Sequence, residues 1–535
     1  MTSDEPAGLE PGDQEGPRTI PEALVIAASQ FGDDEALVDG STRLSFAELA
    51  TTVDEVARAL IASGVGLGDR VALWAPNSAD WVVVSFAIYA AGAVLVPLNT
   101  RFKGDEAGHV LRSSRARLLF AVTDFLGSNL VALLEDVPGL VGLEETVVLD
   151  GPVPSECTAY KEFAARAAGT KQSDLNERRA SLTSGDTSDI IFTSGTTGKP
   201  KGAVLSHGAS VRTYLAWSEL VGLRRGDRYL VVYPFFHTAG LKSGILACVL
   251  RGATIVPHAV FDVASVMGRV AEERISMLPG PPTVFQSILN DPDFASFDLS
   301  SLRLSVTGAA TVPVEVVRRM RDELRFETVV TGYGLTETTG TVSMCRHDDR
   351  PEVIATTVGR PLPGVQVRVV DVHGQDVAPG DSGEILVRGF NVMKEYFEDP
   401  DATRQAIDED GWLRTGDIGL LGDDGNLRIT DRKKDMYIVG GFNAYPAEIE
   451  GIIVRHRQVA QVAVVGTPDE RLGEVGVAFV VPRRHQVIDP DELVAWCREN
   501  MANFKVPRAV QVVDALPLNP SGKVMKFKLR EQLAG

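Results

Sequence analysis

Residues 193–202 read Thr-Ser-Gly-Thr-Thr-Gly-Lys-Pro-Lys-Gly, and they directly follow an Ile-Ile-Phe run at 190–192 that has the character of a buried strand. The three glycines allow the backbone to turn several N–H groups toward one point, where they form a concave set of donors. Side-chain hydroxyls and lysines add hydrogen bonds and positive charge. The stretch therefore predicts a phosphate-binding loop built from Thr193, Ser194, Gly195, Thr196, Thr197, Gly198, Lys199 and Lys201.

The spacing of this loop differs from the common Gly-x4-Gly-Lys-Ser/Thr pattern, because Pro200 stands where that pattern needs its last glycine. Residues 203–205, Ala-Val-Leu, continue as a strand rather than as a helix. We therefore expect backbone donors, and not a helix dipole, to hold the phosphate. An ordinary Gly/Thr/Ser turn between two strands is the structural alternative.

The chain has 535 residues, of which 44% are hydrophobic, so it can bury a large core and exceeds the usual size of one domain. Its formal net charge of −19 argues against a general role on nucleic acids or on membrane surfaces, because both would repel so acidic a body. Local basic groups must therefore hold any anionic ligand.

The N-terminal residues and the spacing of the cysteines predict a cytoplasmic protein. Residues 1–18 are acidic, contain Pro and Gly and lack an apolar core, which predicts a disordered tail rather than a signal peptide. The cysteines stand far apart, with neither disulfide-framework nor zinc-site spacing. They are Cys157, Cys248, Cys345 and Cys497.

One segment, residues 81–98, is uncharged and close to the length of a membrane-spanning helix. Gly92 and Pro97 interrupt it, and it divides into a helix at 81–91 and a β-rich strand at 93–98. We therefore expect a buried helix and strand, and no membrane span.

Strands alternate with helices from about residue 19 to residue 428, which predicts a layered α/β domain that we extend over residues 19–431. Strands are expected at 70–74 and 253–256, and a helix at 313–325. We expect Thr311 to cap that helix and Pro313 to lie in its first turn.

The start of that helix places Gly308, Ala309 and Ala310 at a strand-to-helix turn, where α/β proteins bind ligands. After the charged run at 431–435 the pattern changes. Helices at 447–456 and 490–500 and strands at 461–466, 476–481 and 509–513 fit a compact α+β domain. The charged run itself is either a solvated strand edge or a hinge.

Four further groups carry chemistry. Tyr333, Gly334, Thr336 and Glu337 combine a ring, a hydroxyl and a carboxylate, which suit adenine, phosphate and Mg²⁺. Asp417 could accept both hydroxyls of a ribose. Arg432 could add a second donor to that ribose. Phe236 and His237 form the third group and could line a carboxylate pocket. The fourth is Lys523, which follows a Gly-containing turn and could move into a distant active site as a cation.

Each of these groups alone has an ordinary explanation. A Tyr and a Glu beside glycine occur in plain loops, and a strand-end turn explains a solvated carboxylate. An aromatic cluster with one histidine is more often core packing than a site. A lysine near the chain end is usually solvated.

Taken in order along the chain, the five groups resemble the adenylate-forming superfamily of acyl-CoA synthetases, firefly-type luciferases and peptide-synthetase adenylation domains. The resemblance covers nearly the whole chain after the tail. It implies two αβα sheets plus a small β-barrel in a large N-terminal domain over 19–431. It also implies a hinge at 432–435 that includes Lys434, and a small mobile α+β domain over 436–535.

The same resemblance implies an ATP-dependent acid:CoA ligase, which forms an acyl-AMP with Mg²⁺ and then transfers the acyl group to coenzyme A. The implied roles are catalysis by Lys523, Glu337, Thr193 and His237; Mg²⁺ binding by Glu337 and Thr193; β/γ-phosphate binding by residues 193–201; adenine and ribose binding by Gly308, Ala309, Ala310, Tyr333, Gly334, Thr336, Asp417 and Arg432; CoA binding by Gly440, Gly441 and Phe442; and an acyl pocket of Phe236, His237, Lys242 and Gly332.

Residues 235–240 argue against an amino acid as the substrate. Relatives that activate amino acids carry an Asp in this segment, and this chain has none there. Free CoA is the expected acceptor, because no carrier domain follows Lys523. A finer resemblance is to the ligases of bacterial steroid catabolism, which activate the propanoate side chain of a methyl-hexahydroindanedione. It is carried by residues 234–248, 278–283, 306–314, 435–438 and 502–505.

Several alternatives stay open within this resemblance. Lys242 either donates to a ring ketone of the substrate, or lies at the surface or against CoA phosphate. Thr238, Ala239, Thr338 and Thr339 differ from that steroid branch at positions expected to face the acyl group, so a medium-chain fatty or aryl acid is the alternative substrate. An acyl-AMP ligase that loads a carrier protein and a non-catalytic nucleotide-binding relative are alternatives of another class, and a homodimer is left open.

Overall fold

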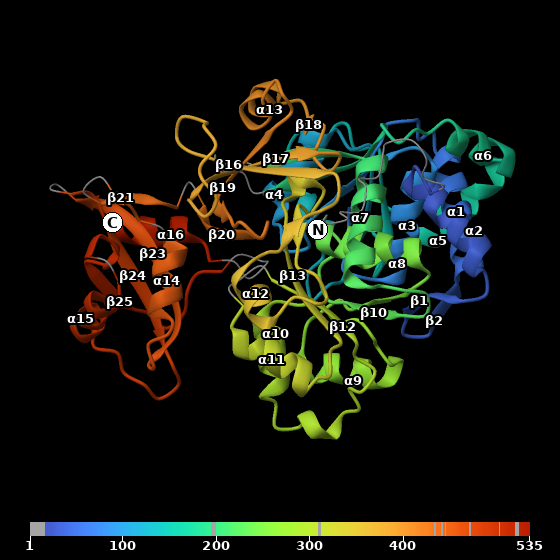
Figure 1. The fold of residues 1–535 in the computed structure, drawn as a ribbon. Helices are drawn as coiled ribbons and strands as arrows, with labels where there is room; N and C mark the ends of the chain where they lie inside the picture. Colours follow the sequence, from blue (N-terminus) through green and yellow to red (C-terminus); the bar gives the residue numbers. More distant parts are fainter. Residues whose placement is uncertain are drawn as a thin grey trace, which may run out of the picture. The chain divides into compact units, whose positions relative to one another are not determined.

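The computed structural model describes residues 16–193, 200–308, 312–432, 435–439, 442–444, 446–469, 472–501, 503–518 and 524–534. The chain divides into two compact units (Figure 1). Unit 1 runs to Val367 and includes Val387–Leu413, and unit 2 comprises Arg368–Leu386 and the chain from Arg414 onward. Most of the predicted tail, residues 1–15, lies outside the described residues.

The larger sheet of unit 1 has eight strands in the order β18-β9-β8-β4-β3-β5-β6-β7. Strands β3 to β8 run parallel, whereas β9 pairs antiparallel with β8 and β18 pairs antiparallel with β9. The bounds are β3 (Arg70–Trp74), β4 (Val94–Pro97), β5 (Leu118–Val122), β6 (Glu145–Asp150), β7 (Thr158–Ala159), β8 (Thr187–Thr193), β9 (Lys201–Ser206) and β18 (Glu395–Tyr396). Parallel strands covered on both faces read as continuous apolar runs, which explains β3, β4 and β5.

A second sheet of unit 1 consists of two four-stranded parts, β10-β11-β1-β2 and β12-β13-β14-β15. Met277 joins them, because it forms parallel bridges to Tyr229 in β10 and to Leu304 in β12. The bounds are β1 (Glu35–Asp39), β2 (Thr42–Ser45), β10 (Arg228–Val231), β11 (Thr254–Pro257), β12 (Leu304–Thr307), β13 (Thr328–Tyr333), β14 (Ser343–Met344) and β15 (Arg360–Pro361).

Two helices, α3 (Ala79–Ala90) and α7 (His207–Val221), contact strands of both sheets and therefore lie between them (Figure 1). Every residue of α3 except Asp80 is buried, which explains why its sequence is apolar on all sides. The expected buried helix and strand at 81–98 are thus confirmed as α3 and β4. Among the described residues, no helix has the length and hydropathy needed to cross a membrane.

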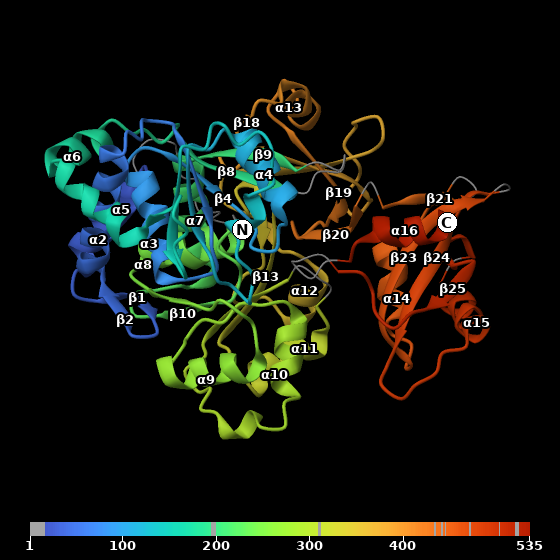
Figure 2. The ribbon, with the colours of Figure 1, turned by 180° about the vertical axis from the view of Figure 1, so that it is seen from behind.

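The remaining helices of unit 1 surround the two sheets, and Figure 2 shows α9, α10 and α11 beside β10 and β13. Their bounds are α1 (Ile20–Phe31), α2 (Phe46–Ala62), α4 (Gly104–Ser114), α5 (Tyr160–Ala165), α6 (Gln172–Ala180), α8 (Ala247–Arg251), α9 (Val263–Glu273), α10 (Pro282–Leu289), α11 (Val314–Asp322), α12 (Pro351–Thr356) and α13 (Pro400–Ala406).

Helix α11 is shorter than the helix predicted at 313–325. It begins at Val314, with Pro313 as the capping residue in extended conformation, and it ends at Asp322. The end has a local cause, because Arg325 has a φ of 59° and cannot continue a right-handed helix. The predicted capping residue Thr311 lies outside the described residues. Val316 and Met320 of α11, and Leu324 just beyond its end, are buried.

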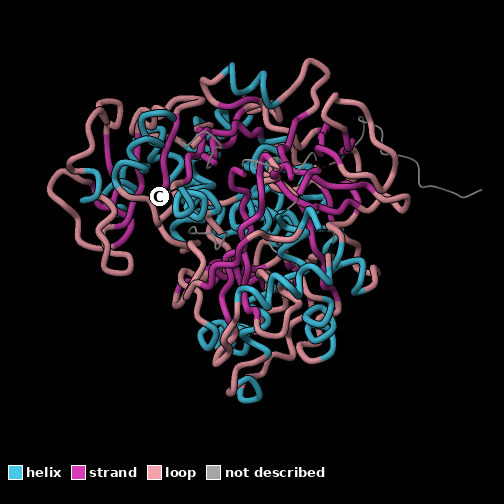
Figure 3. The backbone as a smooth tube through the Cα atoms, turned by 90° about the vertical axis from the view of Figure 1, so that its left-hand side faces the viewer, coloured by secondary structure: helices cyan, strands magenta, loops and turns pink. Residues whose placement is uncertain are grey.

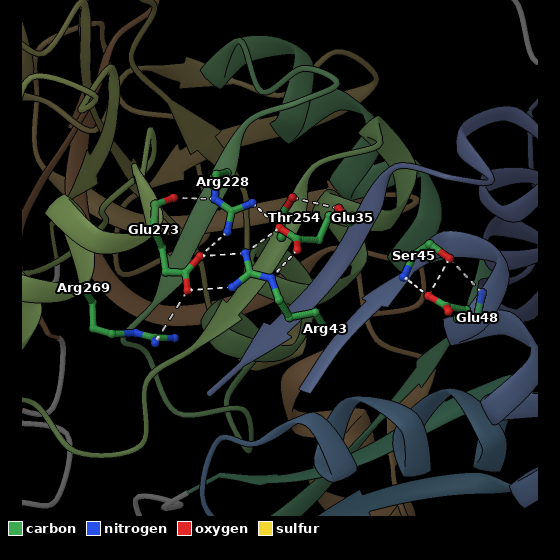
Figure 4. A network of polar contacts seen from close by, with 8 residues as sticks. All are labelled: Glu35, Arg43, Ser45, Glu48, Arg228, Thr254, Arg269 and Glu273. Atoms are coloured by element: carbon green, nitrogen blue, oxygen red, sulfur yellow. Dashed lines mark hydrogen bonds and ion pairs between the residues drawn. The ribbon is translucent and has the colours of Figure 1, made fainter. Parts of the chain in front are cut away.

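An ion-pair network joins three distant segments of unit 1 at the β1–β2 hairpin (Figure 4). The Arg43 guanidinium contacts Glu35 Oε1 at 2.7 Å and Glu273 Oε1 at 3.0 Å. Arg228 pairs with the same two carboxylates, so two guanidiniums alternate with two carboxylates. Planar groups held in this bidentate manner fix β2, β10 and the end of α9 relative to one another.

Unit 2 contains a sheet in the order β22-β21-β24-β23, with β25 paired parallel to β24. Buried residues pack on it in two clusters, one including Ile449 and Leu493 and the other including Phe479 and Leu529. Figure 3 shows its helices in cyan and its strands in magenta. The bounds are β21 (Tyr437–Val439), β22 (Phe442–Ala444), β23 (Val459–Asp469), β24 (Gly473–Pro482), β25 (Ala509–Val512), α14 (Pro446–Ile453), α15 (Pro490–Asn500) and α16 (Lys526–Ala534).

The resemblance implies a small β-barrel, and the structure has a further four-stranded sheet with the order β16-β17-β19-β20. Its strands are β16 (Val365–Val370), β17 (Gly383–Gly389), β19 (Leu413–Leu421) and β20 (Leu427–Arg432). The predicted α/β class, with a large layered part and a small α+β part, is confirmed.

Candidate functional site

The two strands expected on either side of the glycine-rich loop are present, and they pair with each other antiparallel. β8 ends at Thr193 and β9 begins at Lys201, and these two residues are partners in the antiparallel ladder. His109 on α4 supports the exit of the loop, because its Nε2 lies 3.1 Å from the Pro200 carbonyl oxygen. The loop residues Ser194, Gly195, Thr196, Thr197, Gly198 and Lys199 lie outside the described residues.

Glu337 lies beside the base of this loop, on a short 3₁₀ turn, η5 (Thr336–Thr338), that follows β13. The Thr193 hydroxyl lies 3.4 Å from Glu337 Oε1, and the Tyr396 hydroxyl donates to the same oxygen at 2.8 Å. The sequence predicts Thr193 and Glu337 as one metal-binding pair, and the structure brings them together although 144 residues separate them.

These side chains fit a magnesium ion bound with a nucleotide. Carboxylate and hydroxyl oxygens are hard donors, and Mg²⁺ usually takes one or two carboxylates together with substrate phosphates. Within the described part of the chain, no group of three or more His, Cys, Asp or Glu side chains could hold a metal by itself. The donor set therefore suits Mg²⁺ that arrives with a phosphate ligand rather than a closed protein cage.

The other predicted nucleotide residues of unit 1 gather at the same edge of the second sheet. β12 and β13 run parallel, with Thr307 opposite Thr331, so Gly308 follows the end of β12 beside Gly332, which is still within β13 and pairs with Met344 of β14. A β-carbon on Gly308 would lie 3.7 Å from the Gly332 carbonyl oxygen. Gly334 must be glycine for space, because a β-carbon there would lie 2.2 Å from the Gly340 carbonyl oxygen.

The side chain of Asn77, which precedes α3, forms hydrogen bonds with the backbone of the segment that contains Phe236 and His237. The Asn77 amide nitrogen donates to the carbonyl oxygens of Val231 and Tyr233 at 3.0 and 2.9 Å, and its Oδ1 accepts from the Phe235 N–H at 2.8 Å. Phe236 is buried, and its ring centroid lies 4.6 Å from that of His237. One buried amide thus fixes the turn that presents His237.

Replacing Asn77 by alanine is expected to lower the free energy of unfolding by about 1–3 kcal/mol, because the Phe235 N–H and two carbonyl oxygens lose their buried partner. Urea unfolding measures this loss, and chymotrypsin should also cut faster within residues 233–237. The matched control is Asn176→Ala on the exposed side of α6, for which we expect a change within about 0.5 kcal/mol. An equal effect of both changes would contradict this role of Asn77.

Lys242 lies in neither of the two predicted environments. It is 0% exposed, and its Nζ is 2.5 Å from Asp189 Oδ2 in the middle of β8. Tyr89 of α3 and Ser188 donate hydrogen bonds to the same carboxylate. Burial lowers the pKa of the Lys242 ammonium, and the Asp189 charge opposes that shift. Since Lys242 is used in this internal ion pair, the prediction that it lines the acyl pocket is wrong.

The segment that carries Lys242 is a π-helical turn, η3 (Ala239–Leu246). Its wider spacing is visible at its end, where the Ala247 N–H donates to the Lys242 carbonyl oxygen five residues earlier. A single strand, β8, therefore leads into the glycine-rich loop and also binds the turn that follows His237.

Thr338 and Thr339 were expected to face an acyl group, and the structure shows otherwise. Both are 0% exposed. The Thr338 hydroxyl exchanges hydrogen bonds with the backbone of Leu335, and the Thr339 hydroxyl donates to the Asn391 carbonyl oxygen at 2.7 Å. They shape the Glu337 turn instead of lining a pocket.

In unit 2, Asp417 and Arg432 are opposite each other in the antiparallel pairing of β19 and β20. Asp417 is 4% exposed, and its N–H donates to the Thr415 hydroxyl. Phe442 begins β22. The predicted residues Ala309, Ala310, Lys434, Gly440, Gly441 and Lys523 lie outside the described residues.

The sequence matches the models of two domains of one enzyme family. A model described as AMP-binding enzyme matches residues 24–397, and one described as AMP-binding enzyme C-terminal domain matches residues 448–523. The chain therefore belongs to the AMP-binding enzyme family.

Two relatives are similar over nearly the whole chain. The 3-[(3aS,4S,7aS)-7a-methyl-1,5-dioxo-octahydro-1H-inden-4-yl]propanoyl:CoA ligase of Rhodococcus jostii is 48% identical over 523 residues, which cover 97% of this chain and 99% of that protein. The ligase with the same name from Mycobacterium tuberculosis is 48% identical over 514 residues, which cover 96% and 99%. Among solved structures, the anthranilate CoA ligase AuaEII in complex with anthranoyl-AMP superposes with a TM-score of 0.83 at 28% identity, covering 96% of this chain and 98% of that one.

Proposed function

We propose that this chain is an ATP-dependent acid:CoA ligase that activates the propanoate side chain of a methyl-substituted indanedione, an intermediate of sterol ring degradation. The observation that carries the proposal is the 48% identity, over 97% of the chain, with a ligase named for that acyl group. The convergence of Thr193 and Glu337 at the base of the glycine-rich loop supports the nucleotide half of the reaction.

The reaction has two steps. In the first, a carboxylate oxygen of the acid attacks the α-phosphorus of ATP, the bond to the β-phosphate breaks, and pyrophosphate leaves with the electron pair. In the second, the thiol sulfur of CoA attacks the acyl carbon, loses its proton, and AMP leaves. Both steps depend on aligning anions, so positioned cations and donors should dominate catalysis.

Unit 1 supplies groups for the first step. Thr193 and Glu337 would hold Mg²⁺, which neutralises phosphate charge when bound. Lys201 and the glycine-rich loop would bind the β- and γ-phosphates, Tyr333, Gly334, Thr336 and residues 308–310 would bind adenine, and Phe236, His237 and Gly332 would line the acyl pocket. Asn77 keeps the His237 turn in place.

The second step is proposed to use a domain rotation. The domains would be residues 19–431 and 436–535, joined by a hinge at 432–435 that includes Lys434. Asp417 and Arg432 would bind ribose, Lys523 would contact the α-phosphate and the carboxylate during adenylation, and Gly440, Gly441 and Phe442 would meet CoA afterwards. Matches of two separate family models on either side of residue 432 support this division.

The test is pyrophosphate and AMP release with Mg-ATP and CoA over a panel of acids: the indanedione propanoate, fatty acids of medium length, and aryl acids. We expect the indanedione propanoate to exceed the others in kcat/KM by about a hundredfold, a difference of about 2.7 kcal/mol in transition-state binding. Higher kcat/KM with fatty or aryl acids would refute the substrate and leave the adenylation chemistry in place. Acyl-AMP formation without turnover on added CoA would refute CoA as the acceptor.

The proposed setting is the cytoplasm, with the acid, ATP and CoA as partners. The chain is also proposed to form a homodimer. Sedimentation at two protein concentrations, which measures its mass in solution, tests this.

A further inference from the structure

A short strap, residues 391–397, crosses the base of the glycine-rich loop. Its strand β18 pairs with β9, so that Glu395 is opposite Val204 and Tyr396 is opposite Ala203. The Lys394 N–H donates to the Val204 carbonyl oxygen at 2.9 Å, and the Phe397 N–H donates to that of Gly202 at 2.7 Å. The strap is therefore attached to the strand that leaves the glycine-rich loop.

The other side of the strap holds the turn that carries Glu337. The Met393 N–H donates to the Glu337 carbonyl oxygen at 2.8 Å. The buried Asn391 accepts from the Thr339 hydroxyl and donates to the Thr341 carbonyl oxygen at 2.8 Å. Thr339 has a φ of 55°, a left-handed conformation that a β-branched residue adopts only when its surroundings enforce it. The strap thus constrains the turn at three places.

The Tyr396 side chain contacts both the Glu337 turn and Lys201 of β9. Its hydroxyl donates to Glu337 Oε1 at 2.8 Å, and the Lys201 Nζ lies 5.3 Å from the centroid of its ring. The backbone is fixed as well, because the Tyr396 N–H donates to the Thr403 hydroxyl at 3.0 Å.

We infer that Tyr396 is a positioning residue that sets the Glu337 carboxylate relative to Lys201, and so determines how tightly the site binds a divalent cation together with ATP. This inference rests on the proposed function, because it takes Glu337 as a ligand of the cation. Groups that hydrogen-bond to a metal-binding carboxylate fix its orientation, and their loss typically weakens metal binding by 10- to 100-fold.

The experiment uses the full chain with Tyr396→Phe, which removes the hydroxyl and keeps the ring beside Lys201. Electron paramagnetic resonance of free Mn²⁺ in the presence of α,β-methylene-ATP measures the dissociation constant of the cation without any turnover. We expect this constant to rise about tenfold in Tyr396→Phe. The Mg²⁺ concentration for half-maximal activity should rise by a similar factor, while the KM values for the acid and for CoA stay unchanged.

The matched control is Tyr160→Phe, which removes the hydroxyl of the tyrosine that begins α5 in the same unit. Its Mn²⁺ affinity should equal that of the unaltered chain. Equal Mn²⁺ affinities of Tyr396→Phe and the unaltered chain would overturn the inference, as would equal losses in both variants. If the unaltered chain binds Mn²⁺ with the ATP analogue more tightly than Tyr396→Phe but activates no acid, the positioning role stands and the proposed function fails.

Discussion

Replacing Lys242 by methionine is expected to lower the free energy of unfolding by about 3–5 kcal/mol, although the new side chain has similar length. The change leaves the Asp189 carboxylate 0% exposed and without its cationic partner, and among the described side chains the Tyr89 and Ser188 hydroxyls are its remaining donors. Removing one partner of a buried ion pair is costly for this reason. Urea unfolding followed by tryptophan fluorescence reports the loss, since Trp74, Trp81, Trp217 and Trp412 all belong to unit 1.

Two further variants separate charge from packing. In Lys242→Met combined with Asp189→Asn, no charge is left unpaired, so we expect at least half of the lost stability to return. Arg318 and Glu352 form an ion pair of 2.7 Å with side chains 53% and 52% exposed, and Arg318→Met should cost less than about 1 kcal/mol. A double variant as unstable as Lys242→Met would show that methionine packing, and not the bare carboxylate, causes the loss.

Replacing Lys523 by alanine is expected to reduce acid adenylation at least about a hundredfold, because the proposed reaction loses the cation that contacts the α-phosphate and the carboxylate. Acid-dependent exchange of pyrophosphate into ATP measures this step alone. Conversion of supplied acyl-AMP and CoA to the thioester should remain near the level of the unaltered chain, since Lys523 is proposed to withdraw before that step.

Lys528→Ala supplies the control for that experiment, because Lys528 lies on the exposed side of α16, five residues further along the chain. We expect both half-reactions to be unchanged by it. Equal losses of adenylation and thioester formation in Lys523→Ala would contradict the proposed division of labour between the two steps.

Local patterns predicted much of the fold. The helix at 490–500 matches α15, and the strand at 70–74 matches β3, because turn residues and apolar periodicity mark both boundaries. The strand-loop-strand character of residues 190–205 follows from the same signals. The helix predicted at 313–325 was too long, since the left-handed conformation of Arg325 depends on its surroundings and leaves no mark in the sequence.

The site was harder to read, because its supporting contacts join residues far apart in the chain. Asn77 binds Phe235 across 158 positions, and Tyr396 binds Glu337 across 59. Neither asparagine nor tyrosine stands out in its local segment. Lys242 was placed in the acyl pocket through the resemblance, and its burial was not foreseen because a lysine is almost never fully buried unless it is paired. Its partner carried a readable signal, since Asp189 is a lone charge inside the apolar strand β8.

The π-helical turn at Ala239–Leu246 also bears on how such sites diverge. A π-turn amounts to one residue inserted into an α-helix, and each helical residue adds about 100° of rotation. Deletion of a single codon in this turn would rotate the residues on its N-terminal side by about 100° relative to those on its C-terminal side. Lys242 would then no longer face Asp189. Homologues that keep this ion pair therefore cannot tolerate that deletion without leaving a buried charge unpaired. One that first exchanges both charges for neutral residues is free to reorient the His237 segment in a single evolutionary step.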